Sequence, residues 1–125
     1  MGESQTSYSA VLGVVLTNQR KLRNLEQGQM AAMMGLSQAS YSRLEAGKSG
    51  FSVDQMYQAA TALNMSGRDL ITLIDNTVDN LRANGIHVAP QVRGNSSKGK
   101  QGDTGVALIA GAALGALLIG ILSNK

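Results

Sequence analysis

Apolar side chains recur every three or four positions through most of the first 84 residues, the spacing that gathers them on one face of an α-helix. Serines precede two of the later apolar stretches, where a side-chain oxygen can accept a hydrogen bond from the free amides of a first helical turn. The pattern therefore predicts five short helices. They cover about residues 8–24, 27–34 and 38–45, and the last two begin after Ser52 and Ser66.

The pattern changes twice beyond these helices. Residues 85–104 are rich in Gly, Ser, Asn and Lys and contain the only proline of the chain, a composition that cannot bury a core. Residues 105–125 are apolar, and only the last of them carries a charge. We therefore expect a helical domain at 1–84, a flexible linker at 85–104 and an apolar tail at 105–125.

Composition narrows the class of protein. Aromatic residues make up 3% of the chain and tryptophan is absent, which favours helices over a sandwich or barrel. The chain has no cysteine and one histidine, too few side chains for a thiolate site or a catalytic metal centre, so no metal and no cofactor are expected. Paired carboxylates, a nucleophile with its base and a phosphate-binding loop are all missing from the sequence, so an enzyme is not expected.

Charge is unevenly spread along the chain, whose formal net charge is +3. Residues 1–84 hold seven basic and seven acidic side chains, whereas residues 85–125 hold four basic and one acidic. Within the domain, the first fifty residues are mildly basic and the rest are mildly acidic. Such a field suits an anionic partner on one side, but it is far weaker than that of a strongly basic nucleic-acid binder.

The stretch EQGQMAAMMGLSQASYSRLEAGK, residues 26–48, has the pattern of two short helices joined by a tight turn. Ala31 is small enough for two crossing helices to approach closely, and Gly35 can take the positive φ that ends a helix sharply. The outer face of the later of these two helices, the third of the five, carries short or flexible side chains that can enter the major groove of DNA. These residues are Gln38, Ala39, Ser40, Ser42 and Arg43.

This combination of residues and spacings resembles the Cro/cI-type (XRE) helix-turn-helix family of phage and bacterial repressors. The match covers about residues 12–75 and implies an all-α fold in which a five-helix domain binds double-stranded DNA. The resemblance rests on Leu12, Arg20, Gln27, Met30-Ala31, Gly35-Leu36-Ser37, Tyr41-Ser42-Arg43-Leu44-Glu45 and Gly47.

The resemblance implies a role for each DNA-facing residue. Gln27, at the start of the second helix, would touch a phosphate. Gln38, Ala39 and Arg43 occupy the positions that read bases. Glutamine prefers the edge of adenine and arginine that of guanine, while alanine can contact the methyl group of thymine.

Further roles implied by the resemblance concern position and stability. Ser40 and Lys48 would hold backbone phosphates, which position the protein without reading sequence. Arg20 and Glu45 match a pair that forms an ion bridge across the domain in this family. That role is structural, because breaking one side would leave a poorly paired charge.

Two features depart from the family pattern. Val14 and Val15 stand where the first helix usually carries charged residues, so this face is either part of a repacked core or an apolar patch exposed for a partner. The outer, recognition face of this helix carries a single charge, that of Arg43, so a monomer would gain little from phosphate contacts. Association of two or more copies, through the tail or the first helix, would supply the difference.

The tail contains Val106–Leu122, an uncharged run of 17 residues. As a helix it would be roughly 26 Å long, close to the roughly 30 Å of a bilayer's hydrocarbon core. We therefore expect a single transmembrane helix at 105–125, with a helix buried in an oligomer or a coat-like assembly as the alternative. Small residues recur at every fourth position in two rows, which would let helices pack closely in lipid unless they are simple filler. The rows are Ala107, Gly111 and Gly115, and Ala112, Ala116 and Gly120.

Flanking charges orient this tail. Arg93, Lys98 and Lys100 precede the apolar run and only Lys125 follows it. Because basic residues stay on the cytoplasmic side, the N-terminal domain is expected in the cytoplasm, anchored to the cytoplasmic membrane by a single pass.

Two functions are compatible with these parts. The first is a membrane-anchored, sequence-specific DNA-binding protein, either a transcriptional regulator or a tether between DNA and membrane lipid. The alternative is a membrane-anchored helix-turn-helix module of the RodZ type, which binds a cytoplasmic protein and not DNA. The outer face of the third helix, with Gln38, Ser40 and Arg43, favours DNA because it is polar with an arginine, whereas aromatic and acidic residues would favour protein.

Overall fold

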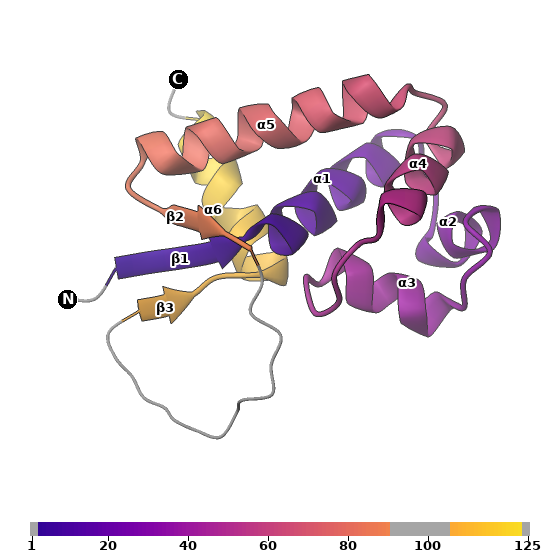
Figure 1. The fold of residues 1–125 in the computed structure, drawn as a ribbon, viewed down its shortest axis with the longest axis horizontal. Coiled ribbons are helices and arrows are strands. Elements are labelled where there is room, and N and C mark those ends of the chain that lie inside the picture. The colour runs from indigo at the N-terminus through magenta and orange to yellow at the C-terminus, as the bar shows by residue number, and fades with distance from the viewer. Residues whose placement is uncertain (1–2, 91–105, 124–125) are drawn as a thin grey trace.

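The computed structural model of the chain describes residues 3–90 and 106–123 (Figure 1). These residues form six helices and three short strands. In chain order they are β1 Glu3–Ser7, α1 Tyr8–Leu22, α2 Gln27–Met33, α3 Gln38–Glu45, α4 Val53–Ala62, α5 Gly67–Ala83, β2 His87–Ala89, β3 Val106–Leu108 and α6 Gly111–Ser123.

The five helices predicted from the apolar spacing are confirmed as α1 to α5. Serine side chains cap four of them, because Ser7, Ser37, Ser52 and Ser66 each accept a hydrogen bond from a backbone amide of the following first turn. At the start of α4 the bond is reciprocal, since Gln55 bonds back to the amide of Ser52 at 3.1 Å. Each helix therefore begins where its sequence satisfies the amides that have no partner within the helix.

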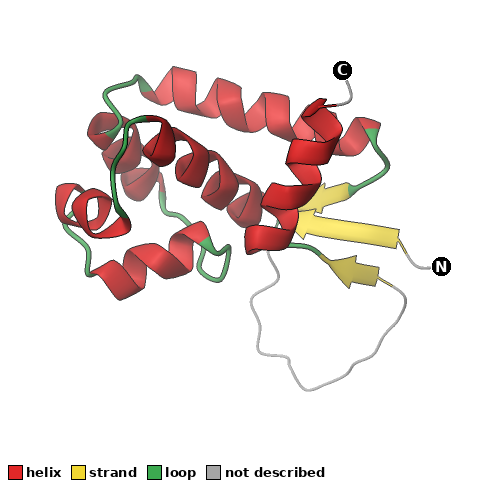
Figure 2. Cartoon of the chain, turned by 180° about the vertical axis from the view of Figure 1, so that it is seen from behind, coloured by secondary structure: helices red, strands yellow, loops and turns green. Residues whose placement is uncertain are grey.

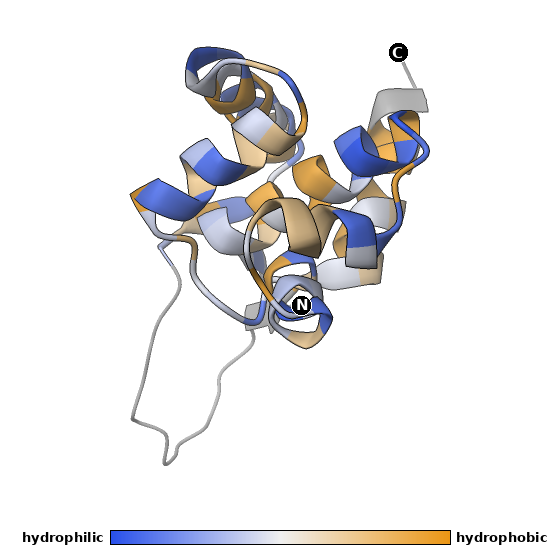
Figure 3. Ribbon diagram, turned by 90° about the vertical axis from the view of Figure 1, so that its right-hand side faces the viewer, coloured by the Kyte–Doolittle hydropathy of each residue, from blue (hydrophilic) through white to orange (hydrophobic). Residues whose placement is uncertain are grey.

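Helix α1 runs through the middle of the molecule (Figure 1). Every residue from Ala10 to Leu16 is buried, so this helix is covered on all sides and needs no polar face there. It contacts α3, α5, α6 and β1. A Cβ added to Gly13 would lie 2.4 Å from the carbonyl oxygen of Glu45, so α1 and α3 approach at backbone distance and only glycine fits. Figure 3 shows the helices alternating between hydrophilic and hydrophobic stretches, as expected for elements that bury one side.

A small parallel sheet corrects the all-α prediction to a mostly helical fold. β1 lies between β2 and β3, with Thr6 opposite Val88 and Ser4 opposite Ala107. The hydroxyl of Thr6, which is buried, donates to the carbonyl of Ile109, and the amide of Ile109 donates to the carbonyl of Gln5 at 2.7 Å. These strands are too short to display an alternating pattern, and their pairing joins segments from the two ends of the chain.

The sheet also changes the interpretation of the segment predicted as a linker. Its first residues, 86–90, pack against the domain as the region of β2, and Ile86 and Val88 are buried in the core. The part of the predicted linker at 91–104 lies outside the described residues. So do the charged residues Arg93, Lys98, Lys100 and Lys125 on which the predicted orientation rested.

The described residues 106–123 do not form the transmembrane helix predicted at 105–125. In place of one long helix, the sequence forms β3 and then α6, a helix of 13 residues. Among the described residues, no helix combines the length and the apolar character needed to cross a membrane. Leu114 and Leu118 of α6 are buried in the core of the domain, beside α1 (Figure 2). Two leucines of the apolar run therefore pack against the protein itself.

The small residues that were predicted to pack helices in lipid lie in a strand and along two hollows of the protein surface. Ala107 lies in β3 and not in a helix. Gly111 begins α6 with a φ of +60°. Together with Ala112, Gly115 and Ala116 it lines a groove between α6, α1 and α3, while Gly120 borders a second hollow beside Asn84.

The alternatives for the valine pair of α1 are now distinguished. Val14 and Val15 are 5% and 6% exposed, so they belong to a repacked core and not to a free surface patch. Helix α6 packs on α1, and Val14 lies at the edge of the groove between them. The predicted use of this part of α1 as an interface between copies is therefore wrong, because the chain covers it with its own C-terminal helix.

Candidate nucleic-acid interface

The unit formed by α2 and α3 is held together by a tight turn. Met34 ends α2, Gly35 adopts a φ of +72°, and the amide of Leu36 donates to the carbonyl of Ala31 at 2.9 Å. Met30 and Ala31 of α2 are buried, which fixes this helix against the core. The turn and the two buried helix faces together hold α3 in one position relative to the rest of the domain.

Helix α3 divides sharply into an inner and an outer side. It buries Tyr41, Leu44 and Glu45, which anchor it to α1 and α2. The candidate base-reading residues lie on the opposite side. Gln38, Ala39 and Arg43 are exposed, Ser40 and Ser42 are half-buried, and Lys48 is exposed beyond the end of the helix.

Two contacts pre-arrange the exposed side chains. A guanidinium nitrogen of Arg43 lies 3.4 Å from the hydroxyl oxygen of Ser40, one turn earlier, to which it donates. The amide oxygen of Gln38 lies against the start of α2, where a Cβ added to Gly28 would be 3.4 Å away. The predicted readers Gln38 and Arg43 are therefore brought together on one exposed surface, which we call the α3 face: Gln38, Ala39, Ser40, Ser42 and Arg43.

Gln27 is placed differently from the sequence-based expectation. Its side-chain amide donates to Oε1 of Glu45 at 2.9 Å and so belongs to the interior hydrogen-bond network. The predicted contact between Gln27 and a phosphate stays a prediction, and it would use the remaining polar groups of this half-buried residue.

A buried polar cluster lies behind the α3 face. Arg20 and Glu45 form the ion pair that the resemblance implied, with 2.6 Å between Nε and Oε2 and 3.1 Å between Nη2 and Oε1. Arg20 also donates to the carbonyl of Leu25 at 2.8 Å, and the Tyr41 hydroxyl donates to Oε2 of Glu45 at 2.5 Å. With the bond from Gln27, the Glu45 carboxylate accepts from three side chains, which is the arrangement that a buried charge requires.

The cluster keeps its charges at neutral pH. Burial by itself would raise the pKa of Glu45, but the hydrogen bonds from Arg20, Tyr41 and Gln27 outweigh burial and lower that pKa. The hydrogen bond to Glu45 raises the pKa of Arg20, and burial, followed by the bond to Glu45, raises the pKa of Tyr41. Tyr41 therefore stays a neutral donor between two paired charges, and the α3 helix is fixed by charge-assisted bonds.

Comparisons with known proteins agree with this geometry. Residues 16–70 match the family model HTH_3, described as "Helix-turn-helix". The matched stretch includes all of α2, α3 and α4, so it contains the two helices and the tight turn described above. None of the curated proteins matches the chain.

Two solved structures are similar to the chain. The restriction-modification controller protein C.AhdI from Aeromonas hydrophila is 28% identical, with a TM-score of 0.47, over 49% of this chain and 92% of that protein. The clp gene regulator ClgR from C. glutamicum is 21% identical, with a TM-score of 0.53, over 56% of this chain and 91% of that protein. The likeness to ClgR shows the same fold for the domain.

Residues outside the recognition motif were missed by the sequence analysis. Thr17, Asn18 and Lys21 of α1 line a groove beside α3, opposite α6. Their spacing of one helical turn places them on one side of α1, but nothing in the sequence indicates that the C-terminal residues return to form the other wall.

Proposed function

We propose that the chain is a sequence-specific DNA-binding protein that regulates transcription by placing α3 in the major groove. The observation that carries this proposal is the α3 face, whose exposed polar side chains stand on a helix that a buried ion pair and a tight turn hold rigidly. A rigid helix with exposed hydrogen-bonding groups on one side is what direct reading of base edges requires.

Each residue of the α3 face has a proposed partner on DNA. Gln38 hydrogen-bonds the adenine edge, Arg43 hydrogen-bonds the guanine edge, and Ala39 contacts the methyl group of thymine. Ser40, close to Arg43, and Lys48, beyond the end of α3, contact phosphates. The membrane anchor and the cytoplasmic-membrane location stay outside this proposal.

The proposal includes a homodimer, because one copy presents few cations to phosphate. A face on α4 and α5 exposes three apolar side chains beside a hollow that Met56, Gly67 and Leu70 also line. Val53 is 69% exposed and Tyr57 is 62% exposed, and Ile71 completes the patch. The Tyr57 ring rests on Gly67, where an added Cβ would lie 2.5 Å from the ring, so this aromatic side chain has a fixed position.

Charges around this patch favour a second copy of the same chain. Asp54 stands beside Val53 on α4, and Arg68 stands beside Gly67 on α5. In a two-fold arrangement, an acidic edge on one copy can face the basic edge of the other, and the apolar side chains meet between them. Paired α3 helices would then read half-sites about 34 Å apart.

Selection of binding sites from random duplex DNA tests the function. We expect the full chain to enrich a sequence with two related half-sites and to protect it from nuclease. Gln38→Ala should remove the preference at one position of each half-site, whereas Asn76→Ala, an exposed change on α5, should leave the enriched sequence unaltered. Failure to enrich any sequence, with no duplex binding at low salt, would contradict the proposal.

A further inference from the structure

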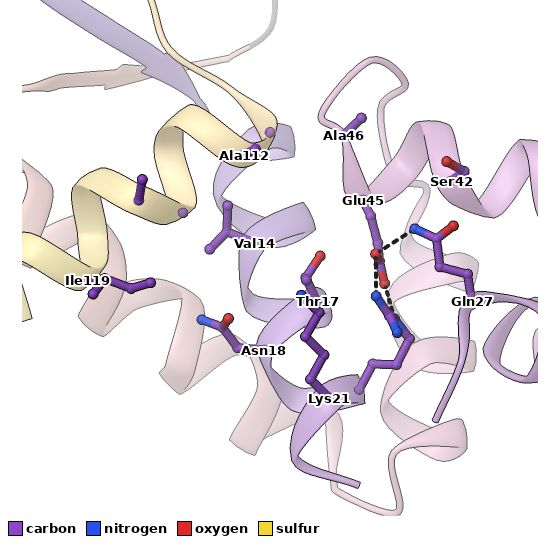
Figure 4. A pocket seen from close by; sticks show the side chains of 14 residues that line it. Val14, Thr17, Asn18, Lys21, Gln27, Ser42, Glu45, Ala46, Ala112 and Ile119 are labelled. Carbon is purple, nitrogen blue, oxygen red and sulfur yellow. Dashed lines mark hydrogen bonds and ion pairs between the residues drawn. The ribbon is translucent and has the colours of Figure 1, made fainter. Parts of the chain in front are cut away.

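A groove runs between α1, α3 and α6, beside the α3 face, and Ser42 of that face lines it (Figure 4). Its volume is about 510 Å³, within the range of sites that hold small organic molecules. One wall is α6 and the other is formed by α1 together with the end of α3.

The two walls differ in chemistry. The α6 wall offers no side-chain hydrogen-bonding group and consists of Gly111, Ala112, Gly115, Ala116 and Ile119. The opposite wall is mainly polar and includes Thr17, Asn18, Lys21 and Ser42, and Val14 is its apolar member. Figure 4 shows Asn18 and Lys21 on one side of the hollow and Ala112 and Ile119 on the other.

Small side chains leave the α6 wall open along its length. A Cβ added to Gly115 would meet no atom within 4 Å, so the groove extends over this glycine. From Gly111 to Ile119 the wall is roughly 12 Å long, from the rise of an α-helix. A short alkyl chain can lie along such a wall and bury apolar surface on it.

The charges that line the groove favour an anion. Three charged side chains contribute, Arg20, Lys21 and Glu45. Arg20 and Glu45 neutralise each other through their ion pair. Lys21 forms no ion pair with any other residue of ranges 3–90 and 106–123, so it leaves the groove one positive charge and a free donor.

We propose that this groove binds an amphipathic organic anion, with its apolar chain along α6 and its carboxylate at Lys21 and Asn18. The polar and apolar walls match the two ends of such a molecule, and the charge of Lys21 sets the sign of its head group. A cation would be repelled by Lys21, and a wholly polar ligand would gain nothing from the α6 wall.

Occupancy of the groove affects DNA binding, a consequence that rests on the proposed function. Ser42 and Ala46 belong to the α3 region and also line the groove, and Gly111 would bring an added Cβ within 3.6 Å of the Ala46 carbonyl oxygen. A bound carboxylate would cancel the charge of Lys21 and place negative charge in a groove that Ser42 of the α3 face also lines, which disfavours the approach of DNA phosphates to that face. DNA and the anion therefore oppose each other, and by linkage each weakens the binding of the other by the same factor.

Calorimetric titration of the full chain, without DNA, tests the site. The ligand probes are decanoate, decanol and decyltrimethylammonium, which share one chain length and differ in head-group charge. We expect saturable binding of decanoate, binding of decanol that is about tenfold weaker and still weaker binding of the cation. Gly115→Leu fills the groove and should weaken decanoate binding at least about tenfold.

Gly120→Leu is the matched control for this experiment. It is the same change in the same helix, it also points into space that is open within 4 Å, and Gly120 does not line this groove. Its decanoate affinity should stay within about twofold of the parent chain. Equal affinity for decanoate and decanol, no saturable binding, or equal effects of the two leucine variants would overturn the proposal.

Lys21→Gln separates the head-group contact from the apolar contact. It should reduce decanoate affinity to that of decanol and leave decanol binding unchanged, and a parallel loss for both ligands would overturn the assignment of Lys21. DNA binding is measured separately with the site found by selection. If decanoate binds as expected and no DNA is bound, the groove assignment holds and the proposed function fails; if DNA binds and decanoate does not, the reverse is true.

Discussion

The carboxylate of Glu45 is the residue-scale feature on which the orientation of α3 depends. It is 5% exposed, yet it accepts hydrogen bonds from Arg20, Tyr41 and Gln27, which belong to α1, α3 and α2. Because one side chain joins three helices, its loss leaves the Arg20 guanidinium buried without an anion. The exposed readers on α3 are therefore positioned by a residue that points away from DNA.

Replacement of Glu45 by glutamine measures this contribution. Glu45→Gln should lower the free energy of unfolding by about 3 kcal/mol, because one partner of a buried ion pair is removed. The lowered pKa of Glu45 gives the parent chain stability that is present above about pH 5 and is lost as the pH falls through the folded-state pKa. Urea unfolding of the variant should therefore depend less on pH below about pH 5. Asp79→Asn, an exposed change on α5, is the control and should match the parent at every pH.

Arg43 is the residue expected to carry most of the base preference. Arg43→Ala should weaken binding to the selected site by about 1–3 kcal/mol and relax the preference at one base pair of each half-site. Binding constants on the selected site and on single-base variants measure both effects. Asn76→Ala, the exposed control on α5, should not alter the base preference. Equal losses on all sequences would show that Arg43 touches only phosphate.

At the scale of elements, α4 and α5 present an apolar face that residues 3–90 and 106–123 leave uncovered. The exposed fractions of Val53 and Tyr57 contrast with the burial of Ala60 and Leu70 on the inner sides of the same helices. A helix pair that carries apolar residues on its outer side as well as on its buried side is expected to bury that outer side against a second protein. The α1 surface, by contrast, is already occupied by α6.

A charge introduced on this face tests the dimer. Val53→Lys places two like charges near the proposed two-fold axis, so sedimentation should show monomers where the parent forms dimers. DNA affinity should fall by roughly 10²–10⁴-fold, because the second half-site is no longer bound as part of one assembly. Leu22→Lys is the control, since Leu22 is exposed at the end of α1 and does not line the hollow of this patch. If Val53→Lys remains dimeric, the interface lies elsewhere.

At the scale of the whole molecule, segments from the N-terminal and C-terminal regions of the sequence pack against each other and against α1. β1 precedes α1, and β3 and α6 return to it from the C-terminal side, so the central helix is covered by segments about one hundred residues apart in sequence. Leu114 and Leu118 enter the same core as the residues of α1 and α5. On this basis α6 contributes to the stability of the helix-turn-helix domain.

Packing of α6 can be measured by truncating one side chain. Leu114→Ala should lower the free energy of unfolding by about 2–5 kcal/mol, the usual cost of a cavity in a core. Ile119→Ala, on the exposed side of the same helix, should change it by no more than about 0.5 kcal/mol. Denaturant unfolding of the full chain gives both values, and equally small effects would mean that α6 is not part of the core.

The sequence by itself determined the local structure of the domain. Helical spacing, serine caps and the glycine turn specify α1 to α5, because these signals act over a few neighbouring residues. The motif around Arg43 and the charge pair of Arg20 and Glu45 were also visible, since their spacing is that of a known domain class.

Tertiary structure decided what the two ends of the chain do. An uncharged run of 17 residues is compatible with a membrane span and with a core helix, because the bilayer and the protein interior are both apolar. Packing of this run against the protein requires an apolar surface for it to cover, which is the Val14 side of α1. It also requires a partner strand, which is Glu3–Ser7, paired with β3. Contacts between residues so distant in sequence leave no periodic signal, so only the folded chain brings Lys21, Ser42 and Gly115 to the same groove.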